Sequence, residues 1–485
     1  MKRIYYKYAL VIATCYLFTV SIIYKCMPLA QSNTTKGSDL RYYLNSTTKD
    51  KVAQDLYKLN WRENEKVYFM KVGNLVEQSD IIDVSSEENS LNCESESSPK
   101  FCKIRAGIYI YSAYYDKRNG TSYIRMISAV AKAITKDYLY ASLACVFSNE
   151  NGGNKSETLF TPLQPYEMCE NHKRRYGGWI FSCQVPNIIR EPPAKIQIRF
   201  NEISNLTKST LKDVCVISRD KNVGRRKLNF GVCVPPLYGE IKAKTLIEFI
   251  EFNRILGADI FILYLENSID SLSMEVRSVI RYYERQNVVM SSPWQLPFTS
   301  DSIWYHGQSL AINDCLYKNM YDFEYLAFID IDEFIIPQTD LITWSDVIGR
   351  LNENDSDMFK RAVGMSFKST FYSEDFSRHV FSNEVSMSVR TNRTKHFSFR
   401  RNKVIVRPEK IFELGIHHVS KPLHEADSQN VLNVPTSVAH IHHYRTCVQE
   451  FGIHCQVRIE DLSVPNKYGQ RVIDNYLKIL FDITP

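Results

Sequence analysis

Three carboxylates stand within four residues at Asp330-Ile331-Asp332-Glu333. Apolar residues flank them on both sides, LAFI before and FIIP after, which predicts a buried strand that presents them at its end. On a continuing strand Asp330 and Asp332 point to one side, about 6–7 Å apart, and Glu333 points to the other. Two carboxylates on one side suit a hard divalent cation, Mn²⁺ or Mg²⁺, that also binds and neutralises a departing diphosphate. The alternative is a solvated acidic turn.

Histidine could supply a further ligand of such a cation. Seven of the 11 histidines lie between residues 417 and 454, and imidazole is a ligand that Mn²⁺ accepts. If residues 438–445 form a strand, His440 and His442 face one side and His443 faces the other. This facing leaves open which of the three binds the metal, and a hydrogen-bonded structural histidine is the alternative for each.

A basic stretch, RRNKVIVR, occupies residues 400–407. Its positive charges could meet a diphosphate. A solvated strand face is the alternative, and it is the one that we favour from the sequence.

The elements that position these residues alternate between strand and helix. Strands are predicted at 229–239, 260–266, 288–292 and 325–337, and helices at 240–257, 271–287 and about 302–321. Gly257 is expected to end the first helix as its C-cap. Alternating units of this kind predict an α/β fold with a doubly wound, mainly parallel sheet, in which ligands sit at the carboxyl ends of the strands.

The first half of the chain has a different residue pattern, without alternating strands and helices. Residues 101–226 predict a β-rich region, and residues 25–100 are polar enough to predict a stem. Residues 8–24 are apolar and uncharged, with three basic residues before them and one after, which predicts a transmembrane signal anchor. Residues 1–7 are then a cytosolic tail and residues 227–485 the remaining domain. A cleaved signal peptide is the alternative to the anchor.

Two further counts indicate the secretory pathway. Ten cysteines lie outside the apolar segment and its edge, without any CxxC spacing, which predicts disulfides rather than a zinc site. Seven sequons predict N-glycosylation, at Asn33, Asn45, Asn119, Asn154, Asn205, Asn354 and Asn392. We therefore expect a single-pass membrane glycoprotein of the Golgi or an earlier compartment, with its body in the lumen.

Composition and motifs exclude several functional classes. The net charge is +6 and four of the positive charges flank the apolar segment, so the body is too close to neutral for nucleic-acid binding. The sequence contains no P-loop, GxSxG, HExxH or GxGxxG motif. Common NTPase, hydrolase, zincin and dinucleotide-binding sites are therefore not expected.

Several segments together resemble glycosyltransferase family 92. They are VCVPPLYG (232–239), FIEFNRILGADIFILY (249–264), the run 307–337 that contains the carboxylates, and HIHHYR (440–445). The resemblance covers about residues 228–460. It implies a GT-A-like fold that holds Mn²⁺ and the diphosphate of a UDP-sugar, and a galactosyl transfer with inversion to glycans of glycoproteins, including fucose of N-glycan cores.

The resemblance also implies roles for particular residues. Asp330 and Asp332 become metal and nucleotide residues, and the HYR pattern favours His443 as the third ligand. Pro235-Pro236 should lie beside the uridine. The helix at 302–321 should face the donor sugar, with nucleotide-sugar contacts expected from Gln308, Asn313 and Asp314; a helix surface is the alternative for these three.

An inverting transferase also needs a general base for the acceptor hydroxyl. Glu374 is our expected base; the neighbouring Asp375 and the more distant Glu413 and Asp427 are other options. A membrane-tethered carbohydrate-binding protein without turnover is the competing function, although a binder has no need of a metal that neutralises diphosphate. A glycoside hydrolase, which would use two carboxylates and no nucleotide, is the third.

Overall fold

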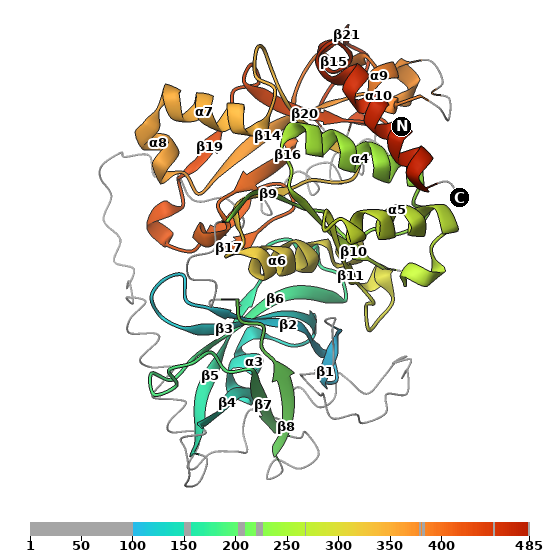
Figure 1. Cartoon of the computed structure of the whole chain (residues 1–485). Coiled ribbons are helices and arrows are strands. Elements are labelled where there is room, and N and C mark those ends of the chain that lie inside the picture. Colours follow the sequence, from blue (N-terminus) through green and yellow to red (C-terminus); the bar gives the residue numbers. More distant parts are fainter. Residues whose placement is uncertain are drawn as a thin grey trace, which may run out of the picture.

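The computed structural model describes residues 100–149, 157–201, 209–219, 227–266, 268–377, 380, 384–449 and 452–483. The expected cytosolic tail, the anchor at 8–24 and nearly all of the stem lie outside these ranges. Within them, no helix combines the length and the apolar character needed to cross a bilayer. Two sheets organise the described part of the chain, one below the other in Figure 1.

The first sheet is antiparallel throughout and its strands lie within the predicted β-rich region. Its order is β1-β2-β3-β6-β5-β4-β7-β8, and one short helix, α3, precedes β4. Its elements are β1 Cys102–Arg105, β2 Ile108–Asp116, β3 Tyr123–Ala131, α3 Lys136–Ser142, β4 Leu143–Asn149, β5 Glu157–Glu167, β6 Tyr176–Gln184, β7 Lys195–Asn201 and β8 Ser209–Cys215.

The second sheet begins with the predicted alternation of strands and helices. This part comprises β9 Leu228–Cys233, α4 Ala243–Leu256, β10 Ile260–Leu265, α5 Met274–Arg285, β11 Val289–Pro293, α6 Gln308–Asn319 and β12 Phe323–Phe328. Gly257 ends α4 with a left-handed backbone, φ 111°, as its position predicts. The helix predicted at 302–321 is shorter than expected, because three residues with positive φ precede Gln308.

The second half of this sheet is built differently. It comprises β13 Glu333–Pro337, α7 Trp344–Asn354, α8 Ser356–Arg361, β14 Gly364–Phe371, α9 Ser386–Val389, β15 Asn392–Thr394, β16 Ser398–Val406, β17 Ile411–Leu414, β18 Val419–Pro422, β19 Val431–Asn433, β20 Ala439–His443, β21 Arg458–Glu460 and α10 Ser463–Ile483. Short 3₁₀ turns lie at Ile269–Ser271, Ser300–Ser302, Trp304–Gly307, Glu374–Phe376, Pro408–Lys410 and Glu425–Asp427.

The strand order makes this a mixed sheet, so the expected parallel arrangement is present only in part. The order is β11-β10-β9-β12-β16-β14-β20-β13, with β19 beside β14. The four strands from β11 to β12 are parallel, and β14 is parallel to β19 and β20. In contrast, β16 runs antiparallel to both of its neighbours and β13 runs antiparallel to β20. Antiparallel strands need no crossover helix between them, so the chain can reverse direction after β12, as it does in the turn that leads to β13.

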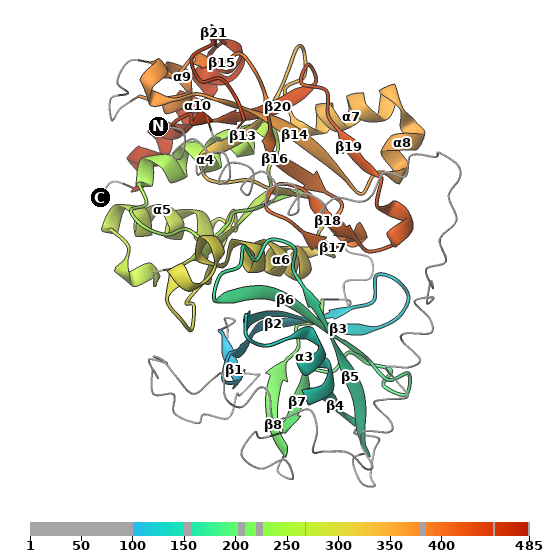
Figure 2. The ribbon, with the colours of Figure 1, turned by 180° about the vertical axis from the view of Figure 1, so that it is seen from behind.

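Helices cover both faces of the parallel half. Helices α4, α5 and α10 lie on one face, and α6 lies on the other, between the two sheets (Figures 1 and 2). The chain winds outward from β9 to β11 and returns through α6 to β12 on the opposite side of β9. The winding therefore reverses between β9 and β12, and the crevice at their carboxyl ends is where such sheets bind ligands.

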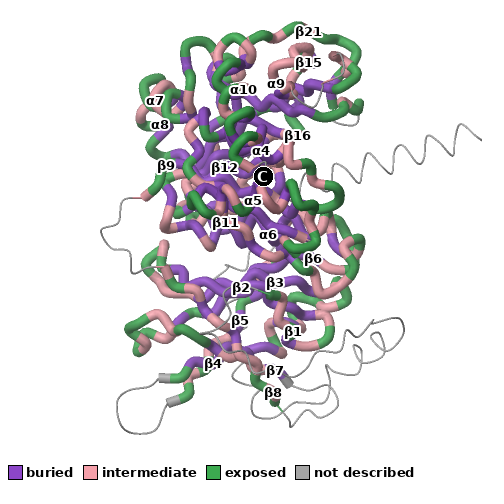
Figure 3. The backbone as a smooth tube through the Cα atoms, turned by 45° about the vertical axis from the view of Figure 1, so that its right-hand side comes forward, coloured by how far each residue is buried: buried purple, intermediate pink, exposed green. Residues whose placement is uncertain are grey.

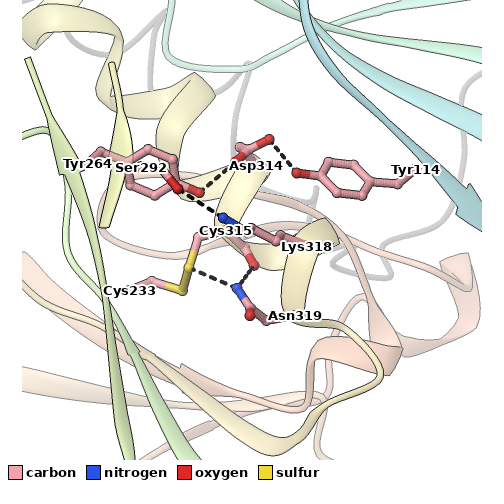
Figure 4. Close-up of a disulfide and its surroundings, with 8 residues drawn as sticks. All are labelled: Tyr114, Cys233, Tyr264, Ser292, Asp314, Cys315, Lys318 and Asn319. Atoms are coloured by element: carbon pink, nitrogen blue, oxygen red, sulfur yellow. Dashed lines mark hydrogen bonds between the residues drawn. A yellow bond between two sulfur atoms is a disulfide. The ribbon is translucent and has the colours of Figure 1, made fainter. Parts of the chain in front are cut away.

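Helix α6 joins the two sheets into one packed body. Figure 3 shows buried residues in both sheets and in α6 between them. Asp314 of α6 is fully buried and accepts hydrogen bonds from the hydroxyls of Tyr114 of β2, at 2.7 Å, and Tyr264 of β10, at 2.6 Å (Figure 4). Ser112 donates a third bond to the same carboxylate.

Disulfides confirm the expectation drawn from the cysteine count. Three are described: Cys145–Cys183 within the first sheet, Cys233–Cys315 between β9 and α6 (Figure 4), and Cys447–Cys455 after β20. The second of them fixes α6 to the end of β9, next to the crevice.

Three of the seven sequons fall in the described ranges. Asn119 and Asn354 are exposed, as attachment of a glycan requires. Asn392 is half-buried in β15, and its Thr394 is fully buried. The other four lie outside the described residues, and glycosylation at all seven stays a prediction.

Candidate functional site

The three carboxylates lie where β12 ends, as the sequence predicts, but they do not continue its strand. Residues 330–332 form a turn in which the Glu333 amide donates to the Asp330 carbonyl at 3.0 Å. The Tyr444 amide, at the end of β20, holds the Asp332 carbonyl at 2.8 Å. The expectation that Asp330 and Asp332 share one side of a strand was therefore wrong, because the chain reverses here to begin β13.

Glu333 lies in the site together with Asp330 and Asp332, and not on the opposite side of a strand as the sequence predicts. Its carboxylate turns back and accepts the Asp330 amide at 3.1 Å. It also lies 3.3 Å from Nζ of Lys403, and only 1% of its side chain is exposed. Burying a carboxylate this deeply is tolerated only when cations and hydrogen-bond donors surround it.

Lys403 of β16 lies between two of the carboxylates. Its Nζ is 3.0 Å from Oδ2 of Asp330 and 3.3 Å from Oε2 of Glu333, and its side chain is 2% exposed. Burial lowers the pKa of Lys403, but the two carboxylates outweigh burial and raise that pKa well above its usual range. The ammonium is therefore a permanent positive charge on the inner side of the turn.

His443 lies between the other pair of carboxylates. Strands β13 and β20 align Glu333 directly opposite His443. The ring has Nδ1 3.1 Å from Oε1 of Glu333 and Nε2 3.4 Å from Oδ1 of Asp332. Burial lowers the pKa of His443, and the carboxylates of Glu333 and Asp332 more than offset it, so the net shift is upward. Burial raises the pKa of Asp332, but His443 and Arg445 hold it below its usual value.

We call Asp330, Asp332, Glu333, Lys403 and His443 the carboxylate cluster. Its exposure is uneven: Asp330 and Asp332 have 31% and 37% of their side chains exposed, while the other three are buried. The open side of the turn thus presents the carboxylates of Asp330 and Asp332, and the buried Nε2 of His443 lies behind Asp332.

These donors fit a divalent cation. Carboxylate oxygens and an imidazole nitrogen are ligands that Mn²⁺ accepts. The 3.4 Å between Oδ1 of Asp332 and Nε2 of His443 is close to the separation of two ligands on one octahedral ion. Glu333 behind Nδ1 is the outer partner that commonly orients a metal-binding histidine.

The backbone that enters α6 is held in an uncommon conformation beside this cluster. Tyr305, His306 and Gly307 have φ of 40°, 54° and 78°, and the Trp294 indole donates to the His306 carbonyl at 2.8 Å. Consecutive positive φ values outside glycine cost free energy and concentrate at functional sites. The next residue, Gln308, extends Nε2 to 3.5 Å from Oδ1 of Asp330; its expected contact with the donor sugar stays a prediction.

An exposed aromatic ring lies against the same corner. The Tyr238 ring stacks on His306 with centroids 3.7 Å apart, and Nδ1 of His306 contacts Glu266 at 2.7 Å. Tyr238 is 42% exposed. Burial, Tyr305 and Asp330 raise its pKa, which indicates that it lies near the carboxylate cluster. Tyr238 follows the Pro235-Pro236 pair expected beside a nucleotide, but the sequence analysis did not single it out.

The structure gives two other expected sugar-binding residues different partners. Asn313 is fully buried and exchanges hydrogen bonds with the Leu414 backbone at 2.9 Å each way. Asp314 is bonded to the first sheet and to β10, as described above. The side chains of both residues form hydrogen bonds within the protein, so we do not include them in the proposed donor site.

The candidates for a general base lie in three different settings. Glu374 is on an exposed 3₁₀ turn and pairs with Arg390. Glu413 is fully buried and accepts bonds from Tyr166, the Cys169 amide and Ser420. Asp427 accepts from Asn430. Of the three, Glu374 has the carboxylate that a substrate could reach most easily.

The basic residues at 400–407 lie in different environments. Lys403 points into the carboxylate cluster, so the favoured view of a solvated strand face was wrong for that residue. Arg407 instead donates to the Phe359 and Ala362 carbonyls. The local sequence offered no signal for this difference, because it depends on the pairing of β16 with β12.

Comparisons with known proteins find a family and relatives for this chain. The family model of glycosyltransferase family 92 matches residues 229–478, which span the whole carboxylate cluster. The chain is 27% identical to beta-1,4-galactosyltransferase galt-1 of Caenorhabditis elegans over 379 residues, 76% of this chain and 81% of that relative. It is 24% identical to galactan beta-1,4-galactosyltransferase GALS3 of Arabidopsis thaliana over 250 residues, 50% of this chain and 44% of that relative.

Proposed function

Because the chain belongs to glycosyltransferase family 92, we propose that it transfers galactose from a UDP-sugar to a glycan acceptor with the help of a divalent cation, Mn²⁺. The observation that carries the proposal is the pair of potential ligand atoms in the carboxylate cluster, Oδ1 of the part-exposed Asp332 and Nε2 of the buried His443, which lie 3.4 Å apart. The names of two relatives support galactose as the transferred sugar. A β-linked product from an α-linked nucleotide sugar requires inversion.

Each residue of the site has a part in this proposal. Asp330, Asp332 and His443 would hold the cation, which when bound neutralises the charge of the leaving diphosphate. Lys403 supplies a fixed positive charge behind Asp330, and Glu333 orients His443. Gln308 holds the Asp330 carboxylate, and Tyr238 offers its face to a nucleobase. Glu374 remains our candidate for the base that takes the acceptor proton.

The acceptor and the compartment belong to the same proposal. Glycans of glycoproteins are the proposed acceptors, with fucose of N-glycan cores offered first in any assay because the family resemblance implies it. The disulfides support an oxidising lumen. We propose the Golgi or another secretory-pathway membrane as the location, with residues 8–24 as the anchor.

The test is release of UDP by the full-length chain from UDP-galactose, with UDP-glucose and UDP-N-acetylglucosamine as competitors. Asp332→Asn should lower transfer by about 10²-fold or more, because the lost anion stabilises the leaving group through the cation. Asp340→Asn is the matched control, since that side chain is 71% exposed and lies outside the carboxylate cluster. Donor binding without UDP release would instead identify a carbohydrate-binding protein.

A further inference from the structure

A second cluster of potential ligands lies on the opposite face of β20. His440 and His442 alternate with His443 along this strand and therefore point away from the carboxylate cluster. They meet Asp461, which directly follows β21, and one ligand atom from each of the three lies within 4.8 Å of the other two. The proposed transfer reaction uses none of these residues.

The three side chains of this cluster are largely buried, and burying polar groups costs free energy unless hydrogen bonds or a metal ion compensate. His440 is 2% exposed and His442 is fully buried, and the Asp461 side chain is 11% exposed. Polar groups that leave water require hydrogen bonds or a metal to offset the lost hydration. Within the described part of the chain, Nδ1 of His442 has no hydrogen-bond partner.

The orientation of His440 is fixed by its backbone contact. Its Nδ1 lies 3.0 Å from the Thr436 carbonyl, which can only accept, so Nδ1 carries the proton. A neutral His440 then presents a lone pair at Nε2. That atom lies 3.2 Å from Nε2 of His442, which is close to the roughly 3.3 Å between two histidine nitrogens bound to one tetrahedral Zn²⁺.

The Asp461 carboxylate is held in the same way by outer partners. Nε of Arg393 contacts Oδ2 at 2.7 Å, and the Ser463 amide donates to Oδ1 at 3.0 Å. Tyr372 is a further neighbour of this carboxylate, and each carboxylate oxygen has a second lone pair with which it could bind a cation. The Thr436 carbonyl thus orients His440, and the Ser463 amide orients Asp461. Hydrogen bonds of this kind to the outer side of a ligand commonly orient residues at metal sites.

We propose that His440, His442 and Asp461 form a structural cation site of the zinc class, distinct from the proposed Mn²⁺ site on the other face of β20. Two imidazole nitrogens and one carboxylate oxygen are a donor set that Zn²⁺ takes with a water as fourth ligand. The alternative to a bound cation is a hydrogen bond from Nε2 of His442 to Nε2 of His440. The Tyr372 hydroxyl lies 3.2 Å from the same Nε2 of His442.

The position of the site suggests what the cation would stabilise. Between His443 and Asp461 the chain passes through the Cys447–Cys455 disulfide, and α10 begins at Ser463. A cation here would fasten this C-terminal segment to β20. Because His443 is adjacent to His442 in the strand, the same link would hold the backbone of a proposed Mn²⁺ ligand.

The test begins with metal analysis of the full-length chain, purified without a metal-affinity tag and dialysed against EDTA to strip weakly held ions. We expect about one equivalent of zinc to remain in the wild-type chain and in Asp332→Asn, which alters only the carboxylate cluster. His442→Gln should lose that equivalent. Zinc lost in Asp332→Asn and kept in His442→Gln would overturn the proposal.

Cobalt keeps the proposal testable even if His442→Gln does not fold. Zinc-free Asp332→Asn protein should bind one equivalent of Co²⁺ with the visible absorption of a four-coordinate ion, and one equivalent of Zn²⁺ should abolish that absorption. A chain that retains no zinc and shows no such absorption with Co²⁺ holds only the hydrogen-bonded histidine pair, and the proposal is then wrong.

Discussion

Nζ of Lys403 lies 3.0 Å from Oδ2 of Asp330, in a position where only 2% of the lysine side chain is exposed. The lysine comes from β16 and the aspartate from the turn after β12, two neighbouring strands of the sheet. The same ammonium contacts Glu333, so one buried cation serves two carboxylates. The turn is therefore stabilised before any metal binds, and its outer carboxylate oxygens stay available.

Lys403→Met tests this internal neutralisation. The variant leaves Glu333 buried without its cation, and breaking one side of a buried ion pair costs about 3–5 kcal/mol. We expect a loss of that order in the free energy of unfolding, measured with urea. Added Mn²⁺ should restore more stability to the variant than to the wild-type chain. Exposed Lys360 on α8, changed to Met, is the control; equal urea midpoints for both variants would contradict the assigned role.

Glu333→Gln should lower the free energy of unfolding markedly, whereas Asp332→Asn should change it little. The sequence placed Glu333 on the far side of a strand, which predicts a small effect. In the structure an amide at this position cannot balance Lys403 and loses the charge that faces Nδ1 of His443. We expect the free energy of unfolding to fall by about 3 kcal/mol, together with a lower transfer rate. A Glu333→Gln chain as stable as Asp332→Asn would restore the earlier interpretation.

The local sequence was sufficient for features that depend on neighbouring residues. The alternation of strands and helices from β9 to β12, the end of α4 at Gly257 and the carboxylates after β12 all follow from short-range patterns. The concentration of histidines also identified β20, and the choice of His443 from the HYR pattern agrees with its place beside Asp332.

The remaining features depend on partners that are distant in the sequence. Lys403 reaches Asp330 because β16 pairs with β12, and Asp314 reaches Tyr114 because α6 packs against the first sheet. No short window of residues contains such pairings. The turn at 330–332 was only the alternative prediction, because residues compatible with a strand and with a turn look alike when apolar residues flank them on both sides.

Asp314→Asn tests whether that buried carboxylate stabilises the fold or contacts the sugar. Three hydroxyls donate to it, and hydrogen bonds to a buried charge are worth about 1.5–3 kcal/mol each. We expect a loss of about 3 kcal/mol in the free energy of unfolding, because the amide nitrogen cannot accept the bonds that one oxygen now accepts. The KM for the donor should stay unchanged. A raised KM in a chain of normal stability would return Asp314 to the sugar site.

Asp116 predicts a pH dependence of stability. Its buried carboxylate pairs with Arg118 at 2.8 Å and Arg125 at 3.3 Å, and Arg118 also donates to the Pro408 and Ile411 carbonyls near β17. Burial raises the pKa of Asp116, but the two guanidinium groups outweigh it and set the pKa below the ordinary 3.8. The pKa of Asp116 is therefore lower in the folded state than in the unfolded state. Such a carboxylate stabilises the fold fully at pH values above its unfolded-state pKa, and this stabilisation is lost as the pH falls through its folded-state pKa.

The corresponding experiment compares Asp116→Asn with the wild-type chain from pH 7 down to pH 3. At pH 7 the variant should be less stable by about 3–5 kcal/mol, because two buried guanidinium groups lose their partner. The difference should shrink below about pH 4, as the wild-type carboxylate takes up its proton. Asp357→Asn, on the exposed side of α8, controls for a general effect of charge. A difference that does not change with pH would show that the carboxylate's charge is not what stabilises this contact.

Tyr238 provides the sharpest test of where a nucleotide binds. Its ring is supported from behind by His306, which the positive φ at that residue and the Glu266 contact hold in place. With 42% of the residue exposed, little packing is lost on truncation, so Tyr238→Ala should unfold at nearly the wild-type temperature. Stacking of a base on an aromatic ring contributes about 1–3 kcal/mol, so the KM for the UDP-sugar should rise about 10-fold or more. Tyr238→Phe keeps the ring and should bind the donor as the wild-type chain does. If Tyr238→Ala and Tyr238→Phe show the same KM, the uracil ring does not stack here, and the donor must approach the carboxylate cluster from another side.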